Sequence, residues 1–227
     1  MIDNTFARAY FDRRMSLGTT SKAQIITAGK LLAEHQMVAG TGGNLSVRLD
    51  DSRVLITRSG VCKGRLTEDD LIEVDLDGNL LSGTGTPSSE SRMHLFTYRE
   101  RPDIQACVHS HPPYSTAFAV AGIELPGDVL PEVVVYIGNI PLVGYAAPGT
   151  DEVPNSLKPY IRSNNAFLMA NHGLLTIGNS MESALNRHET VEQYAKILWL
   201  ARQLGEVSRV PERDLSRLIE IRSRHSG

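Results

Sequence analysis

Residues 87–119, PSSESRMHLFTYRERPDIQACVHSHPPYSTAFA, contain the pattern that decides the fold. The turn residues Pro87-Ser88-Ser89 are typical of a helix start and predict a helix over about Glu90–Arg99. The apolar segment Ala106–Ser110 has the length of a short buried strand. Two prolines follow it, and a short helix is predicted over Tyr114–Val120. This stretch therefore predicts a helix, a strand and a second helix, with two histidines where the strand ends.

Outside this stretch, helices and strands follow one another without the regular order of a parallel strand-helix-strand fold. Short strands gather in the middle of the chain, and the longest helix comes near its end. This order favours an α/β fold with a central, mostly antiparallel sheet and helices packed on its faces. The other predicted elements are helices at Ser21–Gln36, Met181–Leu204 and after Pro211, and strands at Asn44–Leu49, Arg53–Thr57, Leu71–Val74, Val133–Ile137 and Ala166–Ala170.

Composition and charge exclude several classes of partner. The 227 residues are enough for one sizeable domain, predicted over residues 1–227, and 41% hydrophobic with 22% charged residues is ordinary for a globular protein. The net charge of −3 comes without a basic stripe, so no nucleic acid is expected. No apolar run reaches membrane-spanning length and no secretory signal is present, so no membrane is expected either. Two cysteines are too few for a disulfide framework, which favours the cytoplasm.

Three histidines form a candidate metal site. His109 and His111 lie two residues apart in a predicted strand, so their side chains point to the same face. His172 follows an apolar run, where a strand end can present a side chain at a site opening. Three imidazoles leave a fourth position open, as in catalytic zinc sites. The alternative is three unrelated histidines. Cys107 shares the parity of His109 and is either a further ligand or a small buried hydrophobe.

The predicted helix start around Glu90 is a candidate anion and catalytic site. Ser88 and Ser89 supply hydroxyls next to the free N–H groups of a helix N-terminus. Glu90 in the first turn is either a functional carboxylate or an acid favoured only by the helix dipole. His94 lies one turn further on, within reach of Glu90, and is interpreted as structural.

Two loops of small residues are candidate phosphate-binding segments. Thr41-Gly42-Gly43-Asn44 and Arg58-Ser59-Gly60 combine glycines, which permit close backbone approach, with side chains suited to phosphate oxygens. Alone, each loop is better explained as a turn. Neither matches a Walker loop or a dinucleotide fingerprint, so nucleotide binding is disfavoured.

Together, the motifs resemble the class II aldolase family, which includes L-fuculose-1-phosphate aldolase, L-ribulose-5-phosphate 4-epimerase and the adducin head domain. The resemblance implies a three-layer α/β/α sandwich around an antiparallel sheet, and a homotetramer with active sites between subunits. The motifs lie within residues 40–178, and the helices over residues 181–222 fit the C-terminal part of the family. The matching segments are TGGNLSVR, LITRSG, LTEDDLIEVDLDGN, the stretch quoted above, IPLVGYAAPGT and NHGLLTIG.

The resemblance also assigns roles to residues. It implies one zinc ion per subunit, replaceable by manganese or cobalt, bound by His109, His111 and His172. It places the catalytic acid and base at Glu90, where the 4-epimerase has an aspartate, so that an aldolase is favoured over an epimerase. It implies that the phosphate of a small sugar substrate is bound by Gly43, Asn44, Ser59, Gly60, Ser88 and Ser89.

The activity that these roles imply is a zinc-dependent aldolase. It cleaves a ketose 1-phosphate reversibly to dihydroxyacetone phosphate and an aldehyde. The two tyrosines that assist the aldehyde end in the fuculose-phosphate enzyme are not recognisable in this sequence. Leu130-Pro131-Glu132 lies near the position expected for the first, and no tyrosine follows Tyr194 where the second is expected in the C-terminal tail. The substrate is therefore expected to be of the deoxy-pentulose, methylthio-pentulose or fuculose type, and the aldehyde stays open.

Three alternatives remain on the same scaffold. A decarboxylase of a phosphorylated sugar keto-acid would use the same metal, and a cationic group such as Arg58 or Arg92 near the aldehyde end would favour it. A 4-epimerase of a pentulose phosphate is disfavoured by Glu90. A non-catalytic, adducin-like module needs neither the histidines nor Glu90, and their presence argues against it.

Overall fold

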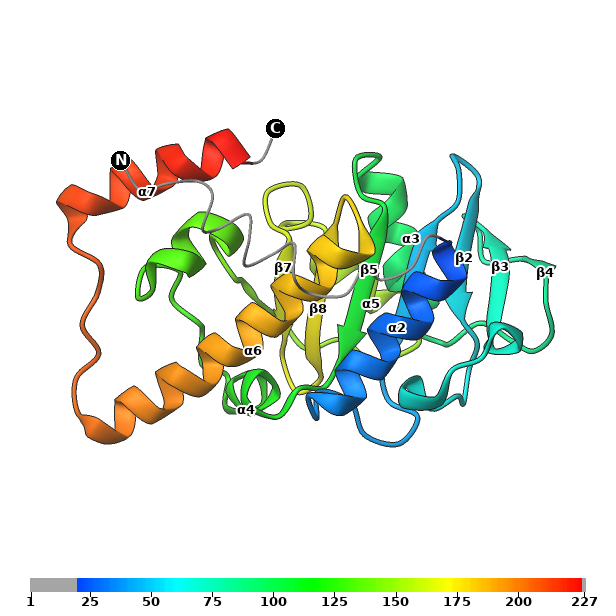
Figure 1. The fold of residues 1–227 in the computed structure, drawn as a ribbon, viewed down its shortest axis with the longest axis horizontal. Helices are drawn as coiled ribbons and strands as arrows, with labels where there is room; N and C mark the ends of the chain where they lie inside the picture. The colour runs from blue at the N-terminus through cyan, green and yellow to red at the C-terminus, as the bar shows by residue number, and fades with distance from the viewer. Residues whose placement is uncertain (1–19, 226–227) are drawn as a thin grey trace.

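A computed structural model describes residues 20–225, and its centre is an eight-stranded sheet in the order β4-β3-β2-β1-β5-β8-β7-β6 (Figure 1). Neighbouring strands are antiparallel except for the parallel pair β6 and β7, which confirms the expected mostly antiparallel sheet. The strands are β1 Asn44–Arg48, β2 Arg53–Thr57, β3 Leu71–Asp75, β4 Leu80–Ser82, β5 Ala106–Ser110, β6 Leu142–Val143, β7 Ala166–Met169 and β8 Gly173–Gly178.

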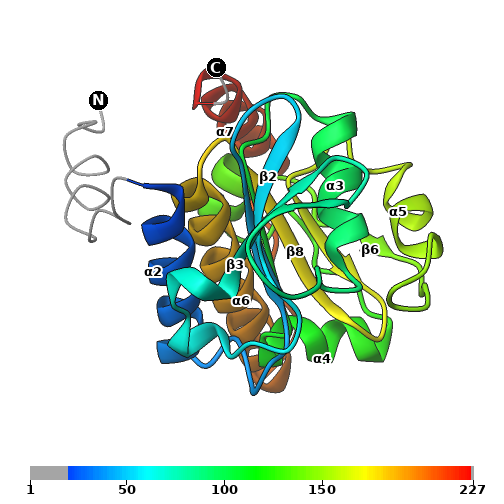
Figure 2. The ribbon, with the colours of Figure 1, turned by 90° about the vertical axis from the view of Figure 1, so that its right-hand side faces the viewer.

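Helices cover both faces of the sheet and make the three layers seen edge-on in Figure 2. Helices α2 (Ser21–Glu34) and α6 (Met181–Leu204) lie on one face, and α3 (Ser91–Glu100) and α5 (Glu152–Leu157) lie on the other. The predicted α/β/α sandwich is therefore confirmed. The structure also contains helices α4 Pro113–Ala121 and α7 Glu212–His225, short 3-10 turns η1 Lys63–Arg65 and η2 Glu68–Asp70, and a turn η3 Val133–Ile137. Within residues 20–225 no helix combines the length and the apolar character that crossing a membrane requires.

The alternation of side chains along β5 divides the core into two layers. Cys107 packs in the cluster under α3 and α5, whereas Ala106 and Val108 pack in the cluster under α2 and α6. Because successive side chains point to opposite faces, His109 lies on the α3 face of the sheet. The strand thus directs this histidine toward the start of α3, where Glu90 lies.

Local capping explains where the long helix α6 begins and ends. Ser180 accepts a hydrogen bond from the backbone N–H of Ser183 at 3.1 Å, and the Ser183 hydroxyl accepts one from the N–H of Ser180 at 3.2 Å. This reciprocal pair is a capping box. Gly205 follows the last residue with a φ of 148°, a conformation that glycine tolerates and other residues rarely adopt. The predicted bounds of this helix are confirmed.

The predicted strand over Val133–Ile137 is wrong, because this segment forms a π-helical turn. The Gly138 N–H donates to the carbonyl of Val133 at 2.7 Å and closes the turn. Val133 and Ile137 are buried in the core cluster that also contains Leu125. A short apolar run buries its side chains equally well as strand or helix, so its pattern does not distinguish the two.

Candidate metal and catalytic site

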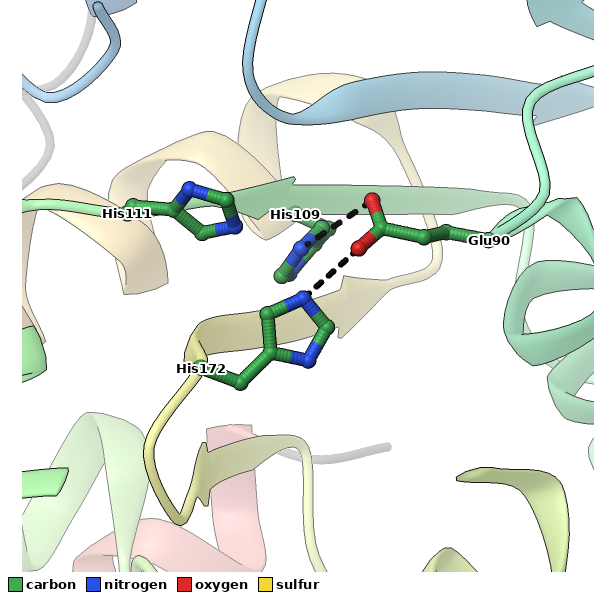
Figure 3. Close-up of side chains that lie close together, drawn as sticks. All are labelled: Glu90, His109, His111 and His172. Atoms are coloured by element: carbon green, nitrogen blue, oxygen red, sulfur yellow. Dashed lines mark hydrogen bonds and ion pairs between the residues drawn. The ribbon is translucent and has the colours of Figure 1, made fainter. Parts of the chain in front are cut away.

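The three candidate histidines come together at one end of the central strands. His109 lies near the end of β5, His111 directly follows it, and His172 lies in the turn between β7 and β8. Their ring centroids are 5.1 Å apart for His109 and His111, 4.8 Å for His109 and His172, and 5.2 Å for His111 and His172. Figure 3 shows the rings facing one another, with Glu90 approaching from α3. Cys107 is buried in the core and is not part of this cluster.

The turn between β7 and β8 presents His172 through two unusual backbone positions. Asn171 has a positive φ of 55°, which asparagine adopts more readily than most residues. Gly173 lies so close to β5 that a Cβ there would be 2.6 Å from Cδ2 of His111 and 2.6 Å from the carbonyl oxygen of Ser110. Glycine at this position therefore allows His111 and His172 to approach each other.

The hydrogen bonds of His109 direct one nitrogen into the cluster. Its Nδ1 lies 2.9 Å from the carbonyl oxygen of Leu174, which can only accept, so Nδ1 carries the proton. Nε2 then keeps its lone pair, and this buried atom has no hydrogen-bond partner among the described residues. A backbone carbonyl that fixes the tautomer in this way is typical of a metal-ligating histidine.

The whole cluster has the donor set of a divalent metal site. One donor atom from each of Glu90, His109, His111 and His172 lies within 4.8 Å of the others. Partial burial lowers the pKa of His111 to about 4, and the charges of His109 and His172 lower it as well. His111 is therefore neutral near pH 7, as a ligand must be. Three imidazoles and a carboxylate are ligands that divalent transition metals accept.

Glu90 is the N-cap residue of α3, and its largely buried carboxylate makes no capping hydrogen bond but points to the histidines. Oε1 is 2.6 Å from Nε2 of His172, and Oε2 is 3.5 Å from Nε2 of His109 and 2.6 Å from the side-chain nitrogen of Asn44. Burial raises the pKa of Glu90, but the interactions with the two histidines outweigh it and hold the pKa well below its usual range. Glu90 does not pair with His94, because the Asn44 amide lies between them.

The six candidate phosphate-binding residues lie on three segments that adjoin one another. Ser59 donates its N–H to the carbonyl of Thr86 at 2.9 Å, so the Ser59–Gly60 loop runs beside the segment that leads to Ser88 and Ser89. The Asn44 amide reaches the Ser88 hydroxyl at 3.4 Å. Gly43 packs so tightly on β5 that a Cβ there would be 2.6 Å from the carbonyl oxygen of His109. These segments therefore meet next to the histidine cluster.

A buried lysine beneath these loops is a candidate that sequence reasoning missed. Lys63 is 2% exposed, and its ammonium donates to the carbonyls of Thr41 at 2.6 Å and Val61 at 2.7 Å. No ion pair joins it to a carboxylate among residues 20–225. Burial lowers the pKa of Lys63, and the nearby charge of Glu90 partly offsets this effect. A single lysine in a loop carries no sequence signal for such a position.

A cavity of about 700 Å³ lies elsewhere, between the end of α2 and helices α4 and α6. Its lining includes Tyr114, Glu132, Glu189 and Lys196, and none of the candidate site residues. The histidine cluster is the stronger candidate for the active site, because it alone combines metal donors, a carboxylate and phosphate-binding loops.

Comparison with known proteins agrees with this geometry. The family described as Class II Aldolase and Adducin N-terminal domain matches residues 23–199. The chain belongs to this family. All four members of the metal cluster and all six candidate phosphate-binding residues of this class II aldolase domain fall inside the matched range.

Its relatives include both aldolases and decarboxylases. The 3-oxo-tetronate 4-phosphate decarboxylase of Haemophilus influenzae is 35% identical over 182 residues, which cover 78% of this chain and 86% of that protein. The 5-deoxy-D-ribulose 1-phosphate aldolase of Bacillus thuringiensis is 32% identical over 199 residues, with 87% and 92% covered. A solved L-fuculose 1-phosphate aldolase has a TM-score of 0.82 and 34% identity, with 89% and 96% covered.

Proposed function

We propose that this class II aldolase family member is a zinc-dependent aldolase. It cleaves a ketose 1-phosphate reversibly to dihydroxyacetone phosphate and an aldehyde. One observation carries the proposal: the Glu90 carboxylate contacts His172 at 2.6 Å and lies beside both the three-histidine cluster and the loops suited to phosphate. Substrates of the deoxy-pentulose, methylthio-pentulose or fuculose type fit this chemistry.

The proposed roles follow from the donors that each residue offers. His109, His111 and His172 would hold the metal, with His109 contributing Nε2. When bound there, zinc would act as a Lewis acid and stabilise the negative charge that develops on the ketose as the carbon–carbon bond breaks. The phosphate would be held by Gly43, Asn44, Ser59, Gly60, Ser88 and Ser89. The homotetramer and the cytoplasmic location remain predictions from the sequence.

Glu90 would handle the proton of the reaction. In cleavage, the Glu90 carboxylate takes the proton from the hydroxyl at the aldehyde end, which becomes the carbonyl, while the electron pair of the broken bond stays on the ketose carbon. Glu90 then gives a proton to that carbon, and in synthesis it removes the same proton. The contacts that lower its pKa come from His109 and His172. If His172 binds the metal through Nε2, it no longer donates a hydrogen bond to Glu90.

The decarboxylase is the second candidate, since relatives of that name are as similar as the aldolases. Loss of the carboxyl carbon from a 3-oxo-tetronate 4-phosphate also leaves dihydroxyacetone phosphate, so the two reactions share one three-carbon fragment. They differ in the fragment that is released, which is an aldehyde in one reaction and carbon dioxide in the other. A substrate that carries a carboxylate would need a cationic side chain to bind it. Arg58 is already paired with Asp70 at 2.7 Å and Arg92 with Asp151 at 2.6 Å, which favours the aldolase.

The test measures both possible released products, the aldehyde and carbon dioxide. Zinc-loaded protein is incubated with a panel of ketose 1-phosphates and, separately, with 3-oxo-tetronate 4-phosphate. Dihydroxyacetone phosphate is detected with a reductase and NADH, and aldehyde and carbon dioxide are measured alongside. We expect dihydroxyacetone phosphate and aldehyde in equal amounts from a ketose 1-phosphate. Turnover of the keto-acid alone, with release of carbon dioxide, would contradict the aldolase and establish the decarboxylase.

A further inference from the structure

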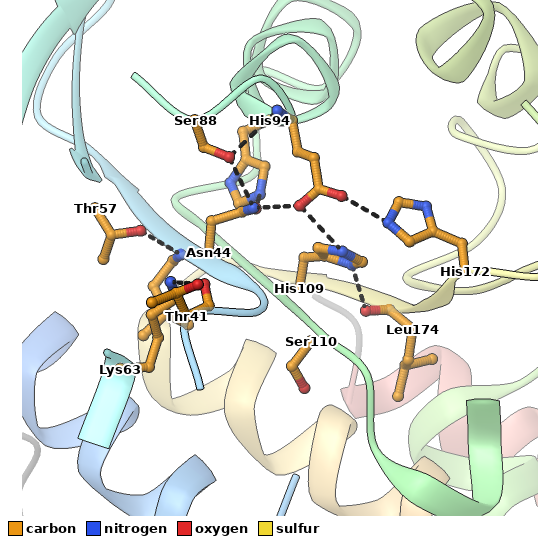
Figure 4. Close-up of polar contacts among 12 residues, drawn as sticks. Thr41, Asn44, Thr57, Lys63, Ser88, His94, His109, Ser110, His172 and Leu174 are labelled. Atoms are coloured by element: carbon orange, nitrogen blue, oxygen red, sulfur yellow. Dashed lines mark hydrogen bonds and ion pairs between the residues drawn. The ribbon is translucent and has the colours of Figure 1, made fainter. Parts of the chain in front are cut away.

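A continuous chain of buried hydrogen bonds leads from the core to Glu90. Ser46, His94, Asn44 and Tyr98 are each no more than 1% exposed. The Tyr98 hydroxyl lies 2.7 Å from Oγ of Ser46, and this oxygen lies 2.6 Å from Nδ1 of His94. Nε2 of His94 lies 2.5 Å from Oδ1 of Asn44, and Nδ2 of Asn44 lies 2.6 Å from Oε2 of Glu90. Figure 4 shows the His94 ring next to the side chain of Asn44.

Two regular elements produce this chain. Glu90 and His94 are one helical turn apart at the start of α3, and Asn44 and Ser46 are two residues apart on β1, so each pair shares a face. Asn44 is also paired with His109 across β1 and β5. The chain therefore joins the helix that carries Glu90 to the strand next to the candidate metal ligand.

The hydrogen bond between Asn44 and Glu90 determines which group donates and which accepts in every other bond of this chain. An ionised carboxylate only accepts hydrogen bonds, so Asn44 must present its NH₂ group to Glu90 and its oxygen to His94. His94 must then donate from Nε2, which leaves Nδ1 to accept from the Ser46 hydroxyl. Ser46 in turn accepts from the Tyr98 hydroxyl. Burial lowers the pKa of His94 to about 3 and raises that of Tyr98, so both groups stay neutral, as this arrangement requires.

We propose that His94 is a positioning residue for Glu90, acting through the amide of Asn44. By donating to Oδ1 of Asn44 it fixes which end of the amide faces Glu90. Oε2 is thereby held by Asn44, and Oε1 is directed toward His172. The catalytic consequence rests on the proposed function, because it requires Glu90 to act on the substrate. The side chain of Asn44 therefore holds the Glu90 carboxylate in place, in addition to any contact that Asn44 makes with the substrate phosphate.

The kinetic test uses two substitutions of the same histidine and one matched control. His94→Met removes both ring hydrogen bonds, whereas His94→Gln keeps a donor and an acceptor. His188→Met removes another fully buried imidazole, bonded to Ser110 at 2.7 Å and Thr176 at 3.0 Å on the opposite face of the sheet. All three are measured for kcat, KM, zinc content and unfolding midpoint.

We expect His94→Met to lower kcat at least about 10-fold with KM within about twofold, as loss of a supporting hydrogen bond does in metal sites. His94→Gln should recover most of that loss. His188→Met should lower the unfolding midpoint about as much as His94→Met does, but keep the wild-type kcat. A wild-type kcat in His94→Met, or equal losses in His94→Met and His188→Met, would overturn the proposal.

A second measurement needs no substrate. In zinc-loaded protein labelled with ¹⁵N-histidine, the resonances of His94 are assigned by their absence in His94→Gln. The proposal requires a neutral ring with the proton on Nε2, and a proton on Nδ1 would overturn it. If no sugar phosphate is cleaved, the proposed function fails while this measurement still decides the hydrogen-bond chain.

Discussion

Oε1 of Glu90 lies 2.6 Å from Nε2 of His172, although 82 positions separate the two residues in the sequence. An imidazole nitrogen cannot donate a proton and bind a metal at the same time. If His172 binds the metal through Nε2, Glu90 and the metal compete for this nitrogen, and this hydrogen bond ends when the metal binds. The carboxylate would then stand beside the metal with one oxygen still held by Asn44. This is the arrangement from which a proton can be passed to a substrate bound there.

Glu90→Gln should abolish most of the activity and leave the metal in place. The amide keeps the size of the carboxylate but cannot exchange a proton, so kcat is expected to fall at least about 100-fold. Three imidazoles remain to hold the metal. Glu100→Gln is the control, since its carboxylate lies on the same helix and pairs with Arg162 away from the histidine cluster. Zinc content and kcat are measured together, and a wild-type kcat in Glu90→Gln would exclude the proposed role.

Gly173→Ala should damage the metal site without a change in any donor. The added Cβ would lie 2.6 Å from Cδ2 of His111, so the ring has to move away from the cluster. Metal affinity is expected to fall about 10-fold or more, as it does when ligand orientation is lost. Gly144→Ala adds the same atom where no other atom lies within 4 Å. Zinc titration of both variants is the measurement, and equal affinities would show that His111 does not need this close packing.

Lys63→Met should weaken phosphate binding more than it changes kcat. The ammonium holds the carbonyls of Thr41 and Val61, and with them the two candidate phosphate loops. Loss of these charged hydrogen bonds should raise KM about 10-fold. It should also reduce the stabilisation by inorganic phosphate in thermal unfolding. Lys22→Met serves as control, because Lys22 is exposed and pairs with Glu68. Undiminished stabilisation by phosphate in Lys63→Met would rule out this role.

Acid should destabilise the metal-free protein well before its carboxyl groups titrate. Burial lowers the pKa of His94 to about 3, of His188 to about 3 and of His111 to about 4. In the unfolded chain a histidine takes up its proton near pH 6.5, so protons bind the unfolded state first as the pH falls. The stability is therefore complete above about pH 6.5 and is lost progressively as the pH falls toward about 4 for His111 and about 3 for His94 and His188, with uptake of roughly three protons on unfolding.

Urea unfolding at a series of pH values measures this dependence. His188→Gln should reduce the proton uptake by about one. A midpoint that does not change between about pH 7 and pH 5 would contradict the low pKa values of the buried histidines.

The elements that the sequence predicted well are those with a strong local signal. Helix α6 has Ser180 before it and Gly205 after it, and β5 is a short apolar run between a loop and two prolines. Strand β4 was missed because all three of its residues are exposed and show no alternation. Helix α5 was missed because its 6 residues are too few to show a helical period of apolar side chains.

The features of the candidate site likewise fall into those that the sequence predicted and those that only the structure shows. The pair His109 and His111 follows from strand alternation alone, and a glutamate at a helix start is visible as a pattern. The contact between Glu90 and His172 depends on how α3 packs against the turn after β7. The hydrogen bonds of His94 depend on β1 lying beside β5. Residue spacing within one element carries no information on either arrangement, so these contacts came only from the structure.

The most direct test of the central claim follows one proton. Zinc-loaded protein is incubated with dihydroxyacetone phosphate in deuterium oxide without any aldehyde, and the substrate is observed by proton NMR. If Glu90 removes a proton from the hydroxyl-bearing carbon, one hydrogen there should exchange for deuterium much faster than without protein. Glu90→Gln should abolish this exchange while keeping its zinc. Absence of exchange in the zinc-loaded wild type, or equal exchange in Glu90→Gln, would contradict the account.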